Sequence, residues 1–134
     1  MKAMKMKAVQ FRIARPTNQL EAIKKFYTEG LGLTVIGEFK GHQGYDGIMI
    51  GLPDKIHHLE FTQTVHDTEI LTPTKENLLV FYYDNSEDYD EAIERLKKLN
   101  YIPVKPENPY WEGKSETYED PDKWRIVLYN GVFK

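Results

Sequence analysis

The sequence predicts an α+β protein made of two βαβββ modules, in which two curved mixed sheets enclose a cavity. The order strand, helix, strand, strand, strand is expected over residues 8–64 and again over 78–132. A polar segment that contains Pro73, residues 65–77, separates the two repeats as a linker. A sheet with a helix on one face leaves its other face open until a second unit covers it. The 134 residues are therefore expected to form a single domain, 1–134, of two modules.

The first module begins with a strand over 8–14, where apolar and polar residues alternate. The next segment has apolar residues at helical spacing. Thr17 or Asn18 is a plausible N-cap for this helix, and Gly30 is expected to end it. Three further strands separated by turns complete the module, at 33–40, 45–52 and 56–63.

The second module repeats this order. Its first strand, 78–83, is rich in apolar and aromatic residues. Asp88, with Glu91 three residues on, is typical of a helix N-terminus. The helix is followed by a loop rich in proline and aromatic residues, 106–113, and by three expected strands, 101–105, 114–118 and 124–129. Both helices contain the tripeptide Glu-Ala-Ile, which supports the repeat only weakly.

Composition excludes several classes of function. The formal net charge is −3 and the basic residues are scattered, so a nucleic-acid partner is not expected. The chain has no cysteine, which excludes disulfides, thiolate chemistry and cysteine-based zinc sites. The basic start has no apolar run behind it, so neither a signal peptide nor a membrane anchor is expected, and the cytosol is the default location.

Three segments, 26–33, 58–61 and 119–126, carry a resemblance to a known family. They read Phe-Tyr-Thr-Glu-Gly-Leu-Gly-Leu, His-Leu-Glu-Phe and Glu-Asp-Pro-Asp-Lys-Trp-Arg-Ile. Because these segments occur in the same order and places as the family's motifs, the sequence resembles the vicinal oxygen chelate superfamily of glyoxalase I, bleomycin-resistance proteins and extradiol dioxygenases. It is most similar to glyoxalase-like proteins of Bacillus-type bacteria, which share the stretches Arg-Ile-Ala-Arg-Pro and Asn-Pro-Tyr-Trp. The resemblance implies a homodimer.

Members of that superfamily that use a metal take one ligand from the first and one from the last strand of each module. The matching positions in this sequence are Arg12, Glu60, Leu78 and Val127. Arginine has no lone pair to offer, and leucine and valine have no donor atoms. One carboxylate alone does not hold a catalytic divalent ion, so we expect neither a metal nor another cofactor.

Arg12 and Glu60 are expected on neighbouring strands that face one cavity. We hypothesise that the guanidinium replaces the metal as the counter-charge of the carboxylate, in a bidentate ion pair. His58 shares the strand face of Glu60, because side chains alternate along a strand. It either acts as a base beside that carboxylate or only lines a polar wall, so no catalytic residue is assigned.

Four other residues are candidates for ligand contacts: Tyr45, Tyr110, Trp111 and Arg125. Tyr110 and Trp111 lie on a loop that either stacks on a planar ligand or covers the sheet edge. Tyr45, in a segment with glycine on both sides, either reaches the pocket or is an ordinary hairpin aromatic. Arg125 shares a strand face with Val127, so it either fixes an anionic ligand or extends to the surface.

Together these features predict a glyoxalase- and bleomycin-resistance-like protein that holds a small, partly apolar molecule between its sheets without a metal. It would either sequester the molecule or act on it through Arg12, His58 and Glu60. One alternative is a metal-dependent lyase or dioxygenase of glyoxalase type. Another is an interaction module whose cavity is filled by its own side chains. The two modules would pair within one chain or across two.

Overall fold

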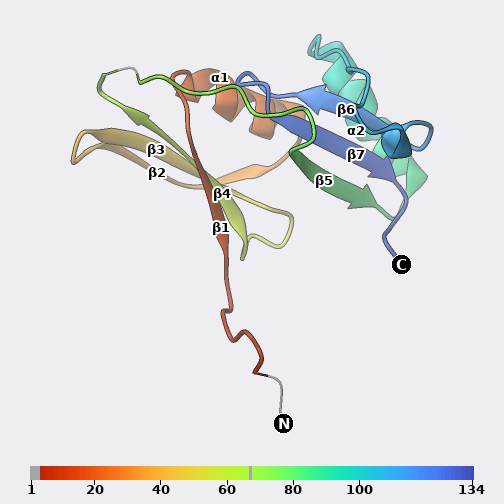
Figure 1. The fold of residues 1–134 in the computed structure, drawn as a ribbon, viewed down its shortest axis with the longest axis horizontal. Helices are drawn as coiled ribbons and strands as arrows, with labels where there is room; N and C mark the ends of the chain where they lie inside the picture. The colour runs from red at the N-terminus through yellow and green to blue at the C-terminus, as the bar shows by residue number, and fades with distance from the viewer. Residues whose placement is uncertain (1–3, 67) are drawn as a thin grey trace.

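The structure, a computed structural model, describes residues 4–66 and 68–134 (Figure 1). Its first module consists of β1 (Arg12–Pro16), α1 (Leu20–Lys25), the π-helical turn η1 (Phe26–Gly30), β2 (Thr34–His42), β3 (Tyr45–Gly51) and β4 (His58–Thr64). Its second module consists of β5 (Leu78–Tyr83), α2 (Ser86–Lys98), the 3-10 turn η2 (Pro109–Trp111), β6 (Ser115–Glu119) and β7 (Arg125–Asn130). In Figure 1 the linker between β4 and β5 runs from one module to the other.

Each module forms a mixed sheet in which the first and the last strand are neighbours. The first sheet has the order β1-β4-β3-β2, with β1 parallel to β4 and the other pairs antiparallel. The second has the order β5-β7-β6, with β5 parallel to β7 and β6 antiparallel to it. The predicted α+β class is therefore confirmed, and both modules share the same parallel pairing of first and last strands.

The predicted strand at 101–105 is wrong. Within this segment only Val104 bridges to the sheet, where its N–H donates to the carbonyl of Thr117 at 2.8 Å. Pro103 and Pro106 flank Val104, and neither has an N–H to continue the ladder. Over the described residues the second sheet therefore has three strands and not four.

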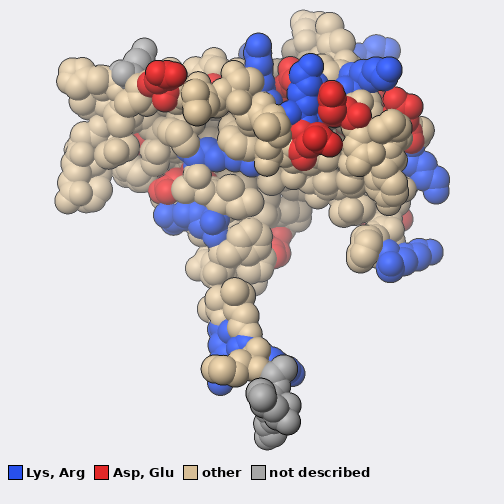
Figure 2. All heavy atoms as spheres, viewed as in Figure 1, with Lys and Arg blue, Asp and Glu red and all other residues tan. Residues whose placement is uncertain are grey.

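The first strand begins later than the sequence suggests, at Arg12 and not at residue 8. Its partner β4 begins at His58, which pairs with Arg12. The described residues before this point, 4–10, have no strand to pair with and extend away from the body (Figures 1 and 2). The other strands end within one or two residues of their predicted limits, which is the usual uncertainty of such boundaries.

The start of α1 is fixed by tertiary structure. Gln19 occupies the N-cap position, and its side chain makes no capping hydrogen bond. The N–H of Leu20 donates instead to Oε1 of Gln63 on β4, at 3.0 Å. The predicted caps, Thr17 or Asn18, are therefore wrong, because a side chain 43 residues away supplies the acceptor.

The start of α2 has a local cap, although not the predicted one. The side chain of Asn85 accepts hydrogen bonds from the N–H groups of Glu87 and Asp88, at 2.8 and 3.2 Å. Asp88 lies in the first turn, where its charge favours the helix dipole. The predicted end of the first helical segment at Gly30 is confirmed. In the described parts of the chain, no helix is long and apolar enough to cross a membrane.

One hydrophobic core joins both modules. Its buried side chains come from the helices and from one face of each sheet, and include Ile23, Phe26, Tyr27, Ile50, Phe61, Leu96, Ile126 and Leu128. The modules meet where η1 packs against α2. A Cβ atom on Gly30 would lie 3.2 Å from Leu96 and 3.3 Å from Tyr101, so a larger residue would force these two side chains of the second module to shift. Nε of Arg95 donates to the Gly30 carbonyl at 3.0 Å.

A polar contact also joins the modules. The hydroxyl of Tyr27 donates to Oδ2 of Asp120 at 2.7 Å, and both side chains are buried. The guanidinium of Arg15 lies 3.7 Å from the centre of the Trp124 ring, in a cation–π contact. Burial is the main reason why the pKa of Asp120 is raised. It also raises the pKa of Tyr27 well above its ordinary value.

We expect the free energy of unfolding of the Asp120→Asn variant to depend less on pH than that of the wild type. Because the pKa of Asp120 is raised above 3.8, the folded state binds this proton more tightly than the unfolded state. The free energy of unfolding should therefore fall as pH rises from about 3.8 through the folded pKa, and this part of the decline should vanish in the variant. Chemical denaturation at several pH values measures it, with Asp90→Asn on the exposed side of α2 as control. A stability difference between wild type and Asp120→Asn that does not change with pH would contradict the prediction.

Candidate functional site

The face of the first sheet that points away from the helices carries a polar cluster. Along β4, Leu59 and Phe61 point into the core, so His58 and Glu60 point to the opposite face. The parallel register places Arg12 of β1 beside His58. The alternation of β4 and its pairing with β1 therefore bring three predicted site residues together.

The guanidinium of Arg12 bridges the other two members of this cluster. Its Nε donates to Nε2 of His58 at 2.9 Å, and its Nη1 lies 3.2 Å from Oε2 of Glu60. The predicted bidentate pair with Glu60 is therefore wrong, because Nε engages His58 and only Nη1 contacts the carboxylate. The side chains of Arg12 and Glu60 are 45% and 15% exposed, and His58 is buried. Because His58 accepts through Nε2, a neutral imidazole carries its proton on Nδ1, which has no partner among the described residues.

This donor set does not fit the divalent ion that metal-using members of the superfamily hold. Arg12 already engages one nitrogen of His58 and one oxygen of Glu60. The other two positions matched from the sequence, Leu78 and Val127, lie on β5 and β7 and have no donor atoms. The described residues contain no group of three or more His, Cys, Asp or Glu that could hold a metal ion.

Tyr45 lies at the other end of the same sheet. It begins β3 and pairs with Thr64, the last residue of β4. Its side chain is exposed and lines a hollow together with Pro16 and Thr62. The structure therefore does not bring Tyr45 into contact with the Arg12 cluster within one chain.

Arg125 is buried in the second module. Its Nε and Nη2 both lie 3.2 Å from Oε2 of Glu119, and its Nη1 donates to the carbonyl of Lys105 at 2.9 Å. The first residue of the first strand pairs with the first residue of the last strand in both modules: Arg12 with His58, and Leu78 with Arg125. Arg125 is therefore the counterpart of His58 in the repeat. The alternative that Arg125 extends to the surface does not hold in this structure.

The aromatic loop residues lie near Arg125 and away from Arg12. The ring of Trp111 meets that of Tyr129 edge to face, with the centroids 5.9 Å apart. Tyr110 packs edge to face on Trp111 at 4.9 Å and is mostly exposed. Trp111 and Arg125 line the same cavity, of about 170 Å³, whose lining comes from the second module and the end of the linker.

Sequence reasoning missed two residues of this second region. Thr117 and Glu119 on β6 share the strand face that carries Arg125, because Tyr118 between them points into the core. The alternation within the predicted strand 114–118 contains that information for Thr117, whereas Glu119 lies one residue beyond its predicted end. The contact of Arg125 with the Lys105 carbonyl could not be predicted from it, because 101–105 was expected to be a regular strand.

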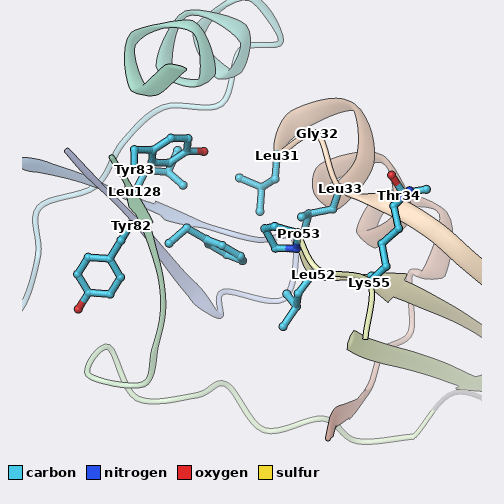
Figure 3. Close-up of a pocket in the computed structure, with 12 residues that line it drawn as sticks. Leu31, Gly32, Leu33, Thr34, Leu52, Pro53, Lys55, Tyr82, Tyr83 and Leu128 are labelled. Carbon is cyan, nitrogen blue, oxygen red and sulfur yellow. The ribbon is translucent and has the colours of Figure 1, made fainter. Parts of the chain in front are cut away.

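A different cavity, of about 270 Å³, lies between the two modules and contains none of the predicted site residues. Figure 3 shows Leu31, Leu33, Leu52 and Pro53 of the first module facing Tyr83 and Leu128 of the second. Most of these side chains are apolar, and none of the hydrogen bonds or ion pairs described above reaches this gap. It is a groove, partly open to solvent, along the line where the modules adjoin.

Solved structures show which fold this chain has. The fosfomycin resistance protein FosX from Mesorhizobium loti superposes with a TM-score of 0.72 at 18% identity, over 96% of this chain and 95% of that one. TnmS3, an antibiotic binding protein from Streptomyces sp. CB03234, gives 0.66 at 22% identity, over 97% and 100%. At such identities the likeness shows the fold alone. The chain has the glyoxalase-like fold of the vicinal oxygen chelate superfamily, as its sequence motifs indicate.

Closer relatives define the family. Models of the YycE-like N-terminal and C-terminal domains match residues 11–62 and 76–130. The uncharacterized protein YycE of Bacillus subtilis (strain 168) is 50% identical over 123 residues, which are 92% of this chain and 88% of that protein. A crystal structure of a Bacillus subtilis YycE protein of unknown function, described only as a candidate glyoxalase/fosfomycin resistance protein, gives a TM-score of 0.90 at 48% identity, over 96% and 93%. This chain therefore belongs to the YycE-like family.

We expect Arg12→Leu to lower the free energy of unfolding by about 1–2 kcal/mol, between the values typical of exposed and of buried ion pairs. Glu60 would lose its cation while mostly shielded from water, and Nε2 of His58 would lose its donor. The double variant Arg12→Leu with Glu60→Leu should recover part of the loss, because no carboxylate is then left unpaired.

The matched control for this prediction is Lys24→Leu, which breaks a 2.8 Å ion pair with Glu38 on the surface. Urea denaturation of all variants provides the comparison. If Arg12→Leu lowered the free energy of unfolding no more than Lys24→Leu does, the Arg12 cluster would contribute no more to stability than a surface ion pair.

Proposed function

We propose that this protein binds a small, partly apolar molecule on the open face of the first sheet, without a divalent ion. The observation that carries the proposal is the position of Arg12, whose guanidinium engages both His58 and Glu60. It supplies a fixed positive charge where metal-using members of the superfamily hold a cation. A guanidinium has five N–H groups, and those that Arg12 does not use here remain available to an acceptor on the ligand.

The surroundings of the cluster support a ligand that is partly apolar. Met49 on β3 pairs with Glu60 and lies on the same face. Phe39 on β2 pairs with Gly47, and its ring lies where a Cβ atom of that glycine would be, within 2.3 Å. The open face therefore combines hydrogen-bond donors with an aromatic ring and a thioether, as ligand pockets do.

The neighbours in fold support a small-molecule ligand in general terms. One is a fosfomycin resistance protein and another an antibiotic binding protein. By analogy, the chain would sequester its ligand as resistance proteins do, or act on it with His58 as base, and we leave the reaction unassigned. We also propose that it works in the cytosol, the location that the sequence suggests.

We further propose that two copies complete the binding site. Within one chain the described interactions of Arg12 stay in the first module, while Trp111 and Arg125 line a cavity of the second. β1 is an edge strand, and an unpaired edge is a template for another chain. The segment before it exposes Met4, Met6 and Val9, which a partner would cover.

The metal-free character can be tested by changing Arg12. We expect the wild type, dialysed against zinc, manganese and nickel in turn and then against buffer, to retain less than one ion per chain. Arg12→His replaces the guanidinium with a third donor beside His58 and Glu60, so it should retain zinc and be stabilised by it. Inductively coupled plasma mass spectrometry and thermal unfolding give the two readouts.

Stoichiometric metal in the wild type that stabilises the fold would contradict the proposal and favour a metal-dependent lyase or dioxygenase instead. A matched control is Thr62→His, which adds a histidine on the same strand face without removing the guanidinium. It should gain no comparable zinc binding.

The proposed dimer can be tested at Val9. Val9→Glu places a charge in the exposed apolar segment and touches no described element of the single chain, so it should weaken dimerisation about tenfold without loss of stability in the monomer. Sedimentation velocity over a range of concentrations measures this. A wild type that is monomeric at every concentration would contradict the proposal, and so would a dimer that Val9→Glu leaves unchanged.

A further inference from the structure

The cavity of the second module contains a buried hydroxyl that nothing in the chain satisfies. Thr117, in the middle of β6, is 2% exposed, and its Oγ1 has no hydrogen-bond partner among the described residues. Its backbone carbonyl accepts from Val104, so only the side chain is left without a partner. Buried polar groups are nearly always paired, which indicates that something other than the described chain meets this hydroxyl.

The space beside Thr117 is large enough for more than one water molecule. It measures about 170 Å³, well above the roughly 10–15 Å³ that a single ordered water needs. Thr117, Arg125 and Leu78 come from the three strands of the sheet and form its floor. Trp111 and Pro106, from the loop between α2 and β6, line it with apolar surface.

This loop is held in place by its own hydrogen bonds. Asn108 accepts from the N–H of Tyr110 at 3.0 Å, and the Ser115 hydroxyl donates to the carbonyl of Trp111. Asn130 of β7 donates its N–H to the carbonyl of Lys114 at 2.8 Å. The cavity is therefore preformed, and binding would not have to order the loop first.

The charges around the cavity select against ions. Arg125 is compensated by Glu119 at 3.2 Å. The cavity lining adds one further cation, Lys75, and two further carboxylates, Glu76 and Glu107. The carboxylates thus outnumber the cations, which disfavours an anion, while the guanidinium in the floor disfavours a cation. A neutral molecule suits this charge pattern.

The hydrogen-bonding groups select the polar part of that molecule. A guanidinium has N–H groups to spare beyond the three bonds that Arg125 makes to Glu119 and Lys105. Together with the Thr117 hydroxyl these donors suit a carbonyl oxygen. The indole of Trp111 and the side chains of Leu78 and Pro106 suit an apolar or aromatic group beside it.

We infer that the second-module part of the proposed binding site takes small neutral molecules that have a carbonyl oxygen next to an aromatic ring. The Thr117 hydroxyl and the Arg125 guanidinium bind the oxygen, and Trp111 contacts the ring. The inference rests on the proposed small-molecule function and names its ligand class, but it needs neither the partner copy nor the metal-free Arg12 cluster, because Thr117, Arg125 and Trp111 line one cavity of a single chain.

The test uses benzamide as the probe and the full chain labelled with nitrogen-15. We expect a saturable shift of the Trp111 indole N–H signal, which Trp111→Phe identifies by its loss, with millimolar affinity as expected of a ligand so small. Benzoate, which has the same shape and a negative charge, should bind at least about tenfold more weakly.

Thr117→Val keeps the shape of the side chain and removes the hydroxyl. It should weaken benzamide binding about tenfold, the effect of one lost hydrogen bond, and should not destabilise the protein because the hydroxyl has no partner in the chain. Thr34→Val, at an exposed threonine of β2 outside both the Arg12 cluster and this cavity, is the matched control and should bind benzamide as the wild type does.

Three results would overturn the inference. The first is the absence of a saturable Trp111 shift, which would mean that water alone fills the cavity. The second is a Thr117→Val protein that binds benzamide as tightly as the wild type. The third is a shift that Arg12→Leu abolishes, which would place the probe at the Arg12 cluster.

Discussion

The contact between η1 and α2 at Gly30 is the constraint on which the rest of the molecule depends. A Cβ atom at this glycine would lie 3.2 Å from Leu96 and 3.3 Å from Tyr101, so any side chain here would require these neighbours to shift. The helices of both modules therefore share one core, and each sheet uses one face to cover that core. The opposite face of the first sheet carries the Arg12 cluster, and the opposite face of the second carries Arg125. A repeat of two units thus presents two faces with polar side chains within one short chain.

On the first of these faces, an arginine stands where the superfamily's chemistry leads one to expect a cation. A metal ion gathers its ligands from several strands, because it needs several deprotonated donors. A guanidinium needs fewer acceptors, so two neighbouring strands suffice for Arg12, His58 and Glu60. The arrangement is less costly than a fully buried ion pair, since Arg12 keeps contact with water. The open side of Arg12 is also what would make it available to the ligand proposed above.

The second module uses the same position differently. Arg125 occupies the place of His58 in the repeat, but it pairs within its own module with Glu119 and a loop carbonyl. Because the loop between α2 and β6 contains prolines, it does not form a fourth strand and instead lines the cavity near Arg125. One repeat has kept an open polar face, whereas the other encloses a small cavity.

The sequence by itself determined the repeat, the class of fold and the face of each strand, because alternation and helical spacing are local properties. It therefore placed Arg12, His58 and Glu60 together. Only the tertiary structure decided where β1 begins, because that depends on the position of β4, and what caps α1, because Gln63 is distant in sequence. It also decided that Trp111 and Arg125 lie apart from Arg12. Local patterns state which way a side chain points along its own strand, but only the packing of the modules fixes which faces meet.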